Sequence, residues 1–185
     1  MTSCLIVIDV QESFRHRPYF FNLQLRPYLI AQNALIAQCQ QRGIPIVRVF
    51  HVEGPKQSSN PFAVESGHIS PLQGLADFDA AITVTKSRHS ALVGTGLDVW
   101  LTQQGIQEVI ISGIRTEQCC ETTARHASDL GWKVIYALDA THTFDMQQLD
   151  GSPLQMSDIK ARTAAVLHGR FARVCNVAEV FKEAA

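Results

Sequence analysis

Short runs of apolar, mostly β-branched residues recur along the chain, and amphipathic stretches separate them. Unbroken apolar runs are typical of buried strands in a parallel sheet, and apolar residues spaced three and four apart indicate helices. The pattern predicts strands at residues 4–8, 45–50, 81–85, 109–111, 133–138 and 172–175. It predicts helices at 22–42, 97–104, 116–130 and 157–168, and a helical turn from 177 onward.

This alternation predicts an α/β fold: a three-layer αβα sandwich around a mostly parallel, Rossmann-like sheet of six strands. The chain has 185 residues without a break in composition, so we expect a single domain, 1–185. Residues 53–74 are rich in Gly, Pro and Ser and predict a long loop. A loop of this length in a compact domain is usually a lid or a binding element.

Composition excludes few functions. Hydrophobic residues make up 46% and charged residues 18%, as in ordinary globular chains. The net charge of -1 provides no basic field for nucleic acid or an anionic membrane, and no segment is long enough to span a bilayer. Asp9 interrupts the first apolar run too early for a signal peptide, so we expect a cytoplasmic protein with five free thiols. The absence of a CxxC pair argues against a zinc knuckle or a thioredoxin motif.

Polar residues follow the predicted strands, at the sheet edge where α/β proteins bind ligands. Asp9 follows the first strand, His51 the second and Lys86 the third, and Cys119 follows the fourth. An acid, a cation and a thiol that meet there can perform cysteine-based acyl transfer. Alternatively, Asp9 caps a helix, Lys86 is a solvated lysine, and His51 is a core or loop histidine.

The sequence around Cys119 predicts a nucleophile elbow. Gly113 interrupts the fourth apolar run, and Thr116 is a good N-cap for the next helix. Cys119 then lies in the first helical turn, where backbone N–H groups and the helix dipole favour a thiolate. Alternatively, Cys119 and Cys120 are small buried hydrophobic residues.

Three segments together resemble the isochorismatase-like cysteine hydrolases, which include nicotinamidases, carbamoylsarcosine amidohydrolases and ureide-cleaving enzymes. The segments are 5–14, 86–98 and 113–125, and the likeness extends to about residue 140. The resemblance implies a catalytic triad of Asp9, Lys86 and Cys119. It also implies a cis peptide bond between Ile114 and Arg115, and an oxyanion hole formed by the backbone N–H groups of Arg115 and Cys119.

In the implied mechanism, Asp9 accepts the thiol proton with assistance from Lys86. Cys119 attacks an amide or ureide carbonyl, and Asp9 returns the proton to the departing nitrogen. Water activated by the same Asp9 then hydrolyses the thioester. The expected partner is a small amide-type molecule, without nucleic acid or membrane, and family members commonly form homo-oligomers, dimers or larger.

Departures from the family pattern narrow the range of activities that the resemblance implies. Nicotinamidases have a metal-binding Asp where this chain has Val49, and only His68 follows His51 in the next loop, so we expect no metal and no cofactor. The isochorismatase branch lacks the nucleophilic cysteine, so Cys119 argues against enol-ether hydrolysis. Cys120 replaces an aliphatic residue and His126 an acid, and we expect both changes to affect packing or ion pairs.

Four residues are expected to contact substrate: Gln11, Phe14, His51 and Thr116. Aromatic residues of the first loop (15–21) and Phe62 are equally compatible with stacking on a flat substrate and with a core or dimer interface. Alternative functions are a catalytically silent binding or scaffold protein, and an isochorismatase-type hydrolase of another small metabolite. A nucleotide-binding domain has weak support because no glycine loop follows the first strand. A redox role for the vicinal cysteines is a strained alternative.

Overall fold

Six parallel strands form one sheet in the order β3-β2-β1-β4-β5-β8 in a computed structural model that describes residues 2–20, 24–54 and 59–182. The strands are β1 (Ser3–Ile8), β2 (Ile46–His51), β3 (Ile82–Lys86), β4 (Glu108–Ile114), β5 (Lys133–His142) and β8 (Arg173–Cys175). The helices are α1 (Leu25–Gln41), α2 (Leu97–Gln103), α3 (Glu121–Asp129) and α4 (Met156–Leu167). The predicted α/β fold is therefore confirmed.

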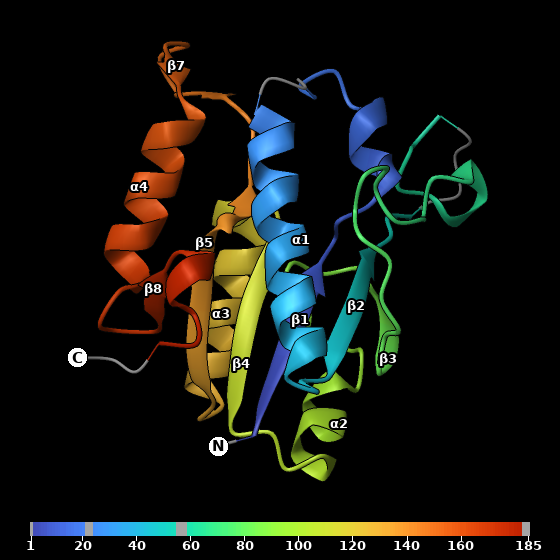
Figure 1. Cartoon of the computed structure of the whole chain (residues 1–185). Helices are drawn as coiled ribbons and strands as arrows, with labels where there is room; N and C mark the ends of the chain where they lie inside the picture. The colour runs from blue at the N-terminus through green and yellow to red at the C-terminus, as the bar shows by residue number, and fades with distance from the viewer. Residues whose placement is uncertain (1, 21–23, 55–58, 183–185) are drawn as a thin grey trace.

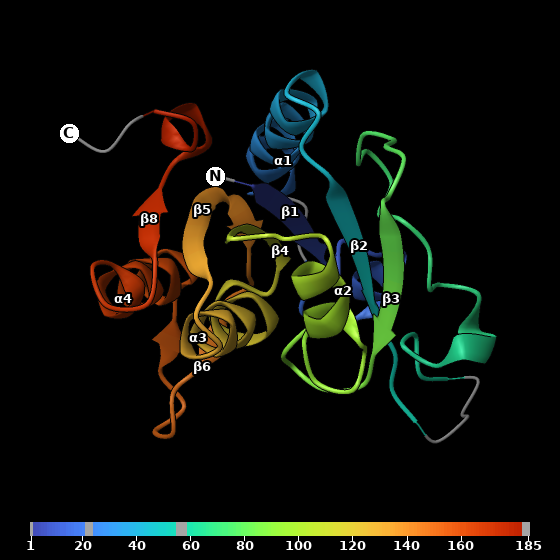
Figure 2. The same cartoon turned by 90° about the horizontal axis from the view of Figure 1, so that it is seen from below.

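The sheet separates two apolar layers, as Figures 1 and 2 show. Alternate side chains of a strand point to opposite faces. In β1, Leu5 and Val7 pack with α1 and with a short 3-10 turn, η5 (Val177–Glu179), whereas Ile6 and Ile8 pack in the layer of α2, α3 and α4. Both faces of the central strand are therefore covered, which explains why its sequence is a continuous apolar run.

Several element boundaries differ from the predictions. β5 continues to His142, beyond the predicted end at residue 138, because a register shift lets Thr141 pair with Gly113 after a bulge. The expected helical turn from residue 177 is present as η5, and residues 183–185 and the first residues of the predicted helix 22–42 lie outside the described part. A 3-10 turn, η1 (Glu12–His16), and a hairpin of β6 (Met146–Gln147) and β7 (Pro153–Leu154) were not predicted. Within the long loop, a further 3-10 turn, η3, occupies Val64–Ser66.

Gly113 lies inside β4 and does not end it, contrary to the sequence interpretation. Its φ is +128°, and a Cβ atom there would stand 2.0 Å from the carbonyl oxygen of Ile8. Gly113 is also paired with Ile8 in the β1–β4 register. The missing side chain therefore allows β4 to run beside the end of β1 and to carry the chain toward Cys119.

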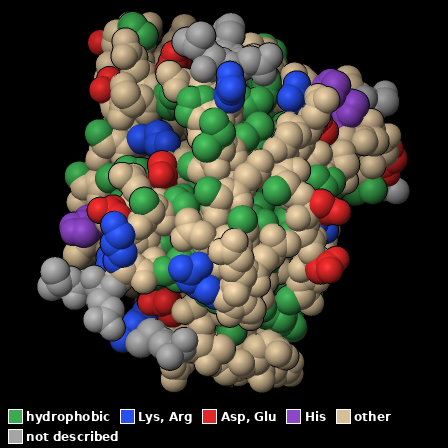
Figure 3. Space-filling model, viewed as in Figure 1, with side chains coloured by type: hydrophobic (Ala, Val, Ile, Leu, Met, Phe, Trp, Pro, Cys, Tyr) green, Lys and Arg blue, Asp and Glu red, His purple; other side chains and the backbone are tan. Residues whose placement is uncertain are grey.

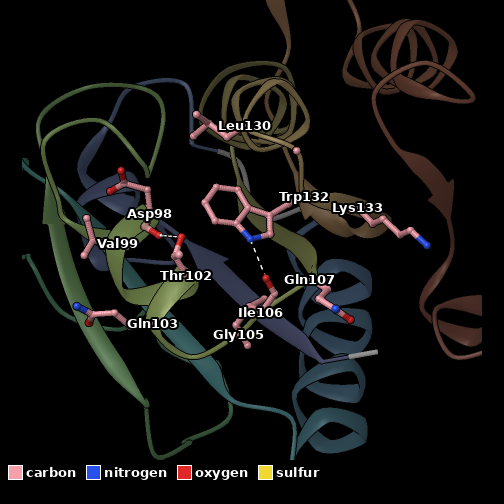
Figure 4. A pocket seen from close by; sticks show the side chains of 11 residues that line it. Asp98, Val99, Thr102, Gln103, Gly105, Ile106, Gln107, Leu130, Trp132 and Lys133 are labelled. Atoms are coloured by element: carbon pink, nitrogen blue, oxygen red, sulfur yellow. Dashed lines mark hydrogen bonds between the residues drawn. The ribbon is translucent and has the colours of Figure 1, made fainter.

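A hollow of about 900 Å³ is at the opposite edge of the sheet, before β4 and β5 (Figure 4). Trp132 lies in it and donates a hydrogen bond from Nε1 to the carbonyl oxygen of Ile106. On the α1 face, Figure 3 shows basic and acidic side chains interspersed, without a large patch of one sign. Among the described residues, no helix is both long and apolar enough to cross a membrane. The expected homo-oligomer remains a prediction.

Candidate active site

Three strand ends bring Asp9, Lys86 and Cys119 into contact. The Lys86 Nζ atom donates hydrogen bonds to Asp9 Oδ2 at 2.7 Å and to Cys119 Sγ at 3.3 Å. Asp9 is 0% exposed, Lys86 2% and Cys119 7%. The alternatives of a solvated lysine and of a helix-capping aspartate are therefore wrong, because the lysine is buried and the carboxylate binds it.

Backbone geometry explains this convergence. The β2–β3 register places His51 directly beside Lys86, and Ile8, the residue before Asp9, lies beside Gly113. Asp9 itself has a φ of +52°, in the left-handed region where aspartate is one of the tolerated residues. The chain thus turns at Asp9, at the end of β1.

A π-helical turn, η4 (Thr116–Cys120), carries Cys119 and joins β4 to α3. The expected cis peptide between Ile114 and Arg115 is present. The predicted N-cap is wrong, because Arg115 precedes the turn and the Thr116 hydroxyl donates to Thr141 Oγ1 at 2.9 Å. Single π-helical turns are frequent at functional sites.

Lys86 also makes a contact with His51, and this contact defines the histidine tautomer. Nζ lies 3.1 Å from His51 Nδ1. An ammonium group has donors but no acceptor, so Nδ1 must accept and the proton of the neutral ring must be on Nε2. That nitrogen is 3.7 Å from Glu53 Oε1. The three contacts of Nζ match the three protons of an ammonium group, and they fix its position.

Burial controls the protonation states of the site. Burial and, to a smaller extent, the charge of Asp9 raise the pKa of Cys119 to about 12, although Lys86 opposes both effects. The expected thiolate at a helix N-terminus is therefore wrong for this structure. Burial also raises the pKa of Asp9, although Lys86 partly offsets this rise. Burial alone would lower the pKa of Lys86, but the charges of Asp9 and Cys119 reverse this and raise it. The arrangement is thus a thiol, an ammonium group and a carboxylate of increased basicity.

Gln11 holds the backbone of His51, and Arg17 holds Glu53 beside the His51 ring. Its backbone N–H donates to Gln11 Oε1 at 2.7 Å, and Gln11 Nε2 donates to the His51 carbonyl oxygen at 3.0 Å. Arg17 donates to Glu53 Oε2 at 3.0 Å. Burial lowers the pKa of His51 to about 4, and the charge of Lys86 contributes in the same direction. His51 is therefore neutral at physiological pH and positions Lys86.

An aromatic wall extends from His51 to Tyr19, and its three middle rings, those of Phe62, Phe14 and Phe144, are buried. The ring centroids of His51 and Phe62 are 5.8 Å apart, those of Phe62 and Phe14 5.0 Å, and those of Phe14 and Phe144 5.9 Å. Tyr19 follows at 5.0 Å from Phe144. A hollow of about 380 Å³ opens beside Tyr19 and Phe144, a volume in the range of small-molecule pockets.

Arg115, which follows the cis peptide, packs against the end of this wall. Its guanidinium lies 5.3 Å from the Tyr19 ring centroid and 5.6 Å from that of Phe144. Its Nε atom is 3.1 Å from Glu117 Oε1 and donates to Thr143 Oγ1 at 3.3 Å. The side chain of Arg115 therefore connects the Cys119 turn to the aromatic residues.

The remaining predicted residues have structural contacts. The Thr116 carbonyl oxygen accepts a hydrogen bond from the Tyr136 hydroxyl at 2.7 Å. Cys120 is fully buried in the apolar layer of α3, and His126 Nδ1 is 2.9 Å from Ser90 Oγ. Substrate contact by Gln11, Phe14, His51 and Thr116 remains a prediction.

Sequence reasoning assigned no role to His89, although it lies within one of the matching segments. Its Nδ1 atom is 3.8 Å from Cys119 Sγ, and its side chain is exposed. The available signal was its position three residues after Lys86, in the loop that follows a strand end. In the described part of the chain, no three His, Cys, Asp or Glu side chains are grouped to hold a metal ion.

The fold and this buried group define an α/β enzyme with a candidate cysteine nucleophile at the carboxyl edge of its sheet. Residues 3–170 match the Isochorismatase domain. The chain therefore belongs to the isochorismatase family and is a hydrolase.

The similarity to known relatives covers almost the whole chain in some cases and about a third of it in others. YrdC of Bacillus subtilis, an uncharacterised isochorismatase family protein, is 23% identical over 97% of this chain and 94% of its own. Nicotinamidase 3 of Arabidopsis thaliana is 45% identical over 62 residues, which are 34% of this chain and 31% of that protein. The solved structure of a cysteine hydrolase from Pseudomonas syringae pv. phaseolicola superposes with a TM-score of 0.86. It covers 97% of this chain and 90% of that one at 20% identity, a likeness that shows the fold.

Proposed function

We propose that this hydrolase uses Cys119 as a nucleophile to cleave a C–N bond of a small amide, ureide or carbamoyl compound through a thioester. The observation that carries the proposal is the position of Lys86 Nζ, which donates to both Asp9 Oδ2 and Cys119 Sγ. A buried thiol alone would be an inert packing residue. A buried thiol beside a carboxylate and an ammonium group has a proton acceptor and a counter-charge for its anion.

The first proton transfer takes place between Cys119 and Asp9. Asp9 takes the thiol proton, a transfer that leaves the net charge of the buried group unchanged, and Lys86 stabilises the resulting thiolate. The sulfur attacks the carbonyl carbon, and Asp9 then donates the proton to the departing nitrogen. The backbone N–H groups of Arg115 and Cys119 are the proposed donors to the carbonyl oxygen. The loss of one such donor typically reduces the rate by about 100-fold or more.

Two features support a flat, small substrate. His51 and Tyr19, the partly exposed ends of the aromatic wall, offer ring faces for stacking, and the hollow beside Tyr19 has the volume of a small-molecule site. The local similarity to a nicotinamidase supports an amide-type substrate. The resemblance to the cysteine-containing branches of the family favours C–N cleavage over enol-ether hydrolysis.

Ammonia release from a panel of small amides, ureides and carbamoyl compounds tests the proposal. Wild type should release ammonia from at least one class, Cys119→Ala should release none, and Cys120→Ala should retain most of the rate. Cys120 is a matched control because it is an adjacent buried thiol without a contact to Lys86. Equal release by wild type and Cys119→Ala would show that the nucleophile is wrong. Silence of wild type across the panel would favour a binding or scaffold role.

A further inference from the structure

Two nitrogen atoms lie beside the sulfur of Cys119, and their surroundings differ. Lys86 Nζ is 3.3 Å from Sγ and is buried together with Asp9. His89 Nδ1 is 3.8 Å from Sγ on an exposed side chain. The thiol therefore has a buried cation on one side and a solvent-facing imidazole on another. The mechanism described above uses only the buried side.

The second half of the reaction requires a water molecule from solvent. Once an acyl group occupies Sγ, water must reach the acyl carbon from the open part of the site. Asp9 is 0% exposed, its Oδ2 accepts from Lys86, and its Oδ1 is buried as well. Asp9 is thus well placed for a proton exchanged with the sulfur and poorly placed for one taken from incoming water.

Three residues interact with His89. Cys119 of η4 contacts its Nδ1 atom, and Asp9, which follows β1, and His51 of β2 interact with it electrostatically. Asp9 and Lys86 carry opposite charges and form an ion pair. Of these groups, His89 alone combines an exposed side chain with a nitrogen beside the reacting sulfur.

We propose that His89 is a catalytic residue, the general base that activates water for hydrolysis of the Cys119 thioester. This inference rests on the proposed function. Nδ1 accepts one proton from water while the water oxygen bonds to the acyl carbon. The C–S bond then breaks with its electron pair on sulfur, and the imidazolium returns the proton to Sγ. A carboxylic acid leaves, and both side chains regain their starting forms.

p-Nitrophenyl acetate separates the two halves of the reaction. Its nitrophenolate leaves without a proton, so a rapid first release reports acylation and the later steady release reports hydrolysis of the acetyl-enzyme. The variant is His89→Asn, which keeps a polar side chain of smaller size. His168→Asn is the matched control, because His168 is also exposed and lies at the end of α4.

In His89→Asn, we expect the amplitude and rate of the first release to remain near the wild-type values. The steady release should fall about 100-fold, the usual contribution of a general base. Acetylated Cys119 should accumulate in acid-quenched protein, and added imidazole should restore part of the steady rate.

Other outcomes overturn the inference. An unchanged steady release in His89→Asn would leave Asp9 as the base for both steps. Loss of the first release in a folded variant, checked by thermal melting, would show that His89 acts on the thiol itself. Failure of wild type to acetylate Cys119 at all would reject the proposed nucleophile, and this inference with it.

Discussion

Replacement of Lys86 by Met tests the central feature of the site, the buried cation shared by a carboxylate and a thiol. Methionine nearly preserves the volume of the lysine stem, so the main change is the loss of charge. Asp9 is then left in a site with 0% exposure and without its hydrogen-bond donor. Since an uncompensated buried carboxylate is very unfavourable, Asp9 will take up a proton in the folded variant.

The free energy needed to protonate Asp9 sets an upper limit on this destabilisation. An aspartate in the unfolded chain has a pKa near 3.9, so protonating it at pH 7 costs at most about 4 kcal/mol, and at pH 5 about 1.5 kcal/mol. A raised folded-state pKa of an acid favours the folded state at low pH and loses this advantage as the pH rises. The free energy of unfolding of Lys86→Met should therefore fall further below wild type between pH 5 and pH 7.

Urea unfolding at pH 5, 6 and 7 measures this difference, and turnover should be lost at every pH. Lys133→Met is the control, because Lys133 is exposed at the start of β5 and its replacement should change stability by less than about 0.5 kcal/mol. The reasoning is refuted if the Lys86→Met deficit is the same at pH 5 and pH 7, since loss of packing alone has no such pH dependence.

Three other outcomes are expected. Gly113→Ala should destabilise the protein by several kcal/mol and lower its melting temperature strongly, because the added Cβ meets the Ile8 carbonyl oxygen at 2.0 Å. Gly131→Ala is the control: its added Cβ has nothing within 4 Å, so it should cost about 1 kcal/mol. Wild type should lose stability as the pH falls from about 6.5 toward 4, because His51 stays neutral in the folded state and gains a proton when unfolded. The His51→Gln variant should lose less stability over this range. Dialysis against EDTA should leave turnover within about twofold of its starting value, and a larger loss that added zinc restores would contradict the expectation that the protein needs no metal.

The layered architecture follows from local information in the sequence. A strand covered on both faces needs apolar residues at every position, so runs such as Leu5 to Ile8 identify the central strands directly. Parallel strands joined by helices place their carboxyl ends at one edge, so Asp9, His51 and Lys86 could be assigned to a common site from their positions alone.

The chemistry of that site depends on distances across the chain. Asp9 and Lys86 are separated by 77 positions and Lys86 and Cys119 by 33, so no local pattern reveals that one ammonium group contacts both. Local reasoning predicted a favoured thiolate from the helix N-terminus, but desolvation in the folded protein raises the pKa of Cys119 to about 12. Burial is a property of the assembled layers and has no counterpart in a short segment.

Tertiary contacts also explain the local features that the sequence pattern predicted wrongly or incompletely. Gly113 resembled a strand end, but the close approach of Ile8 keeps it within β4. Thr116 resembled an N-cap, but its hydroxyl bonds to Thr141 on a strand that extends further than predicted. The sequence by itself determined which elements form and which edge of the sheet carries the polar residues. Only the tertiary structure decided which of those residues touch, which are desolvated, and that His89 reaches the sulfur from the solvent side.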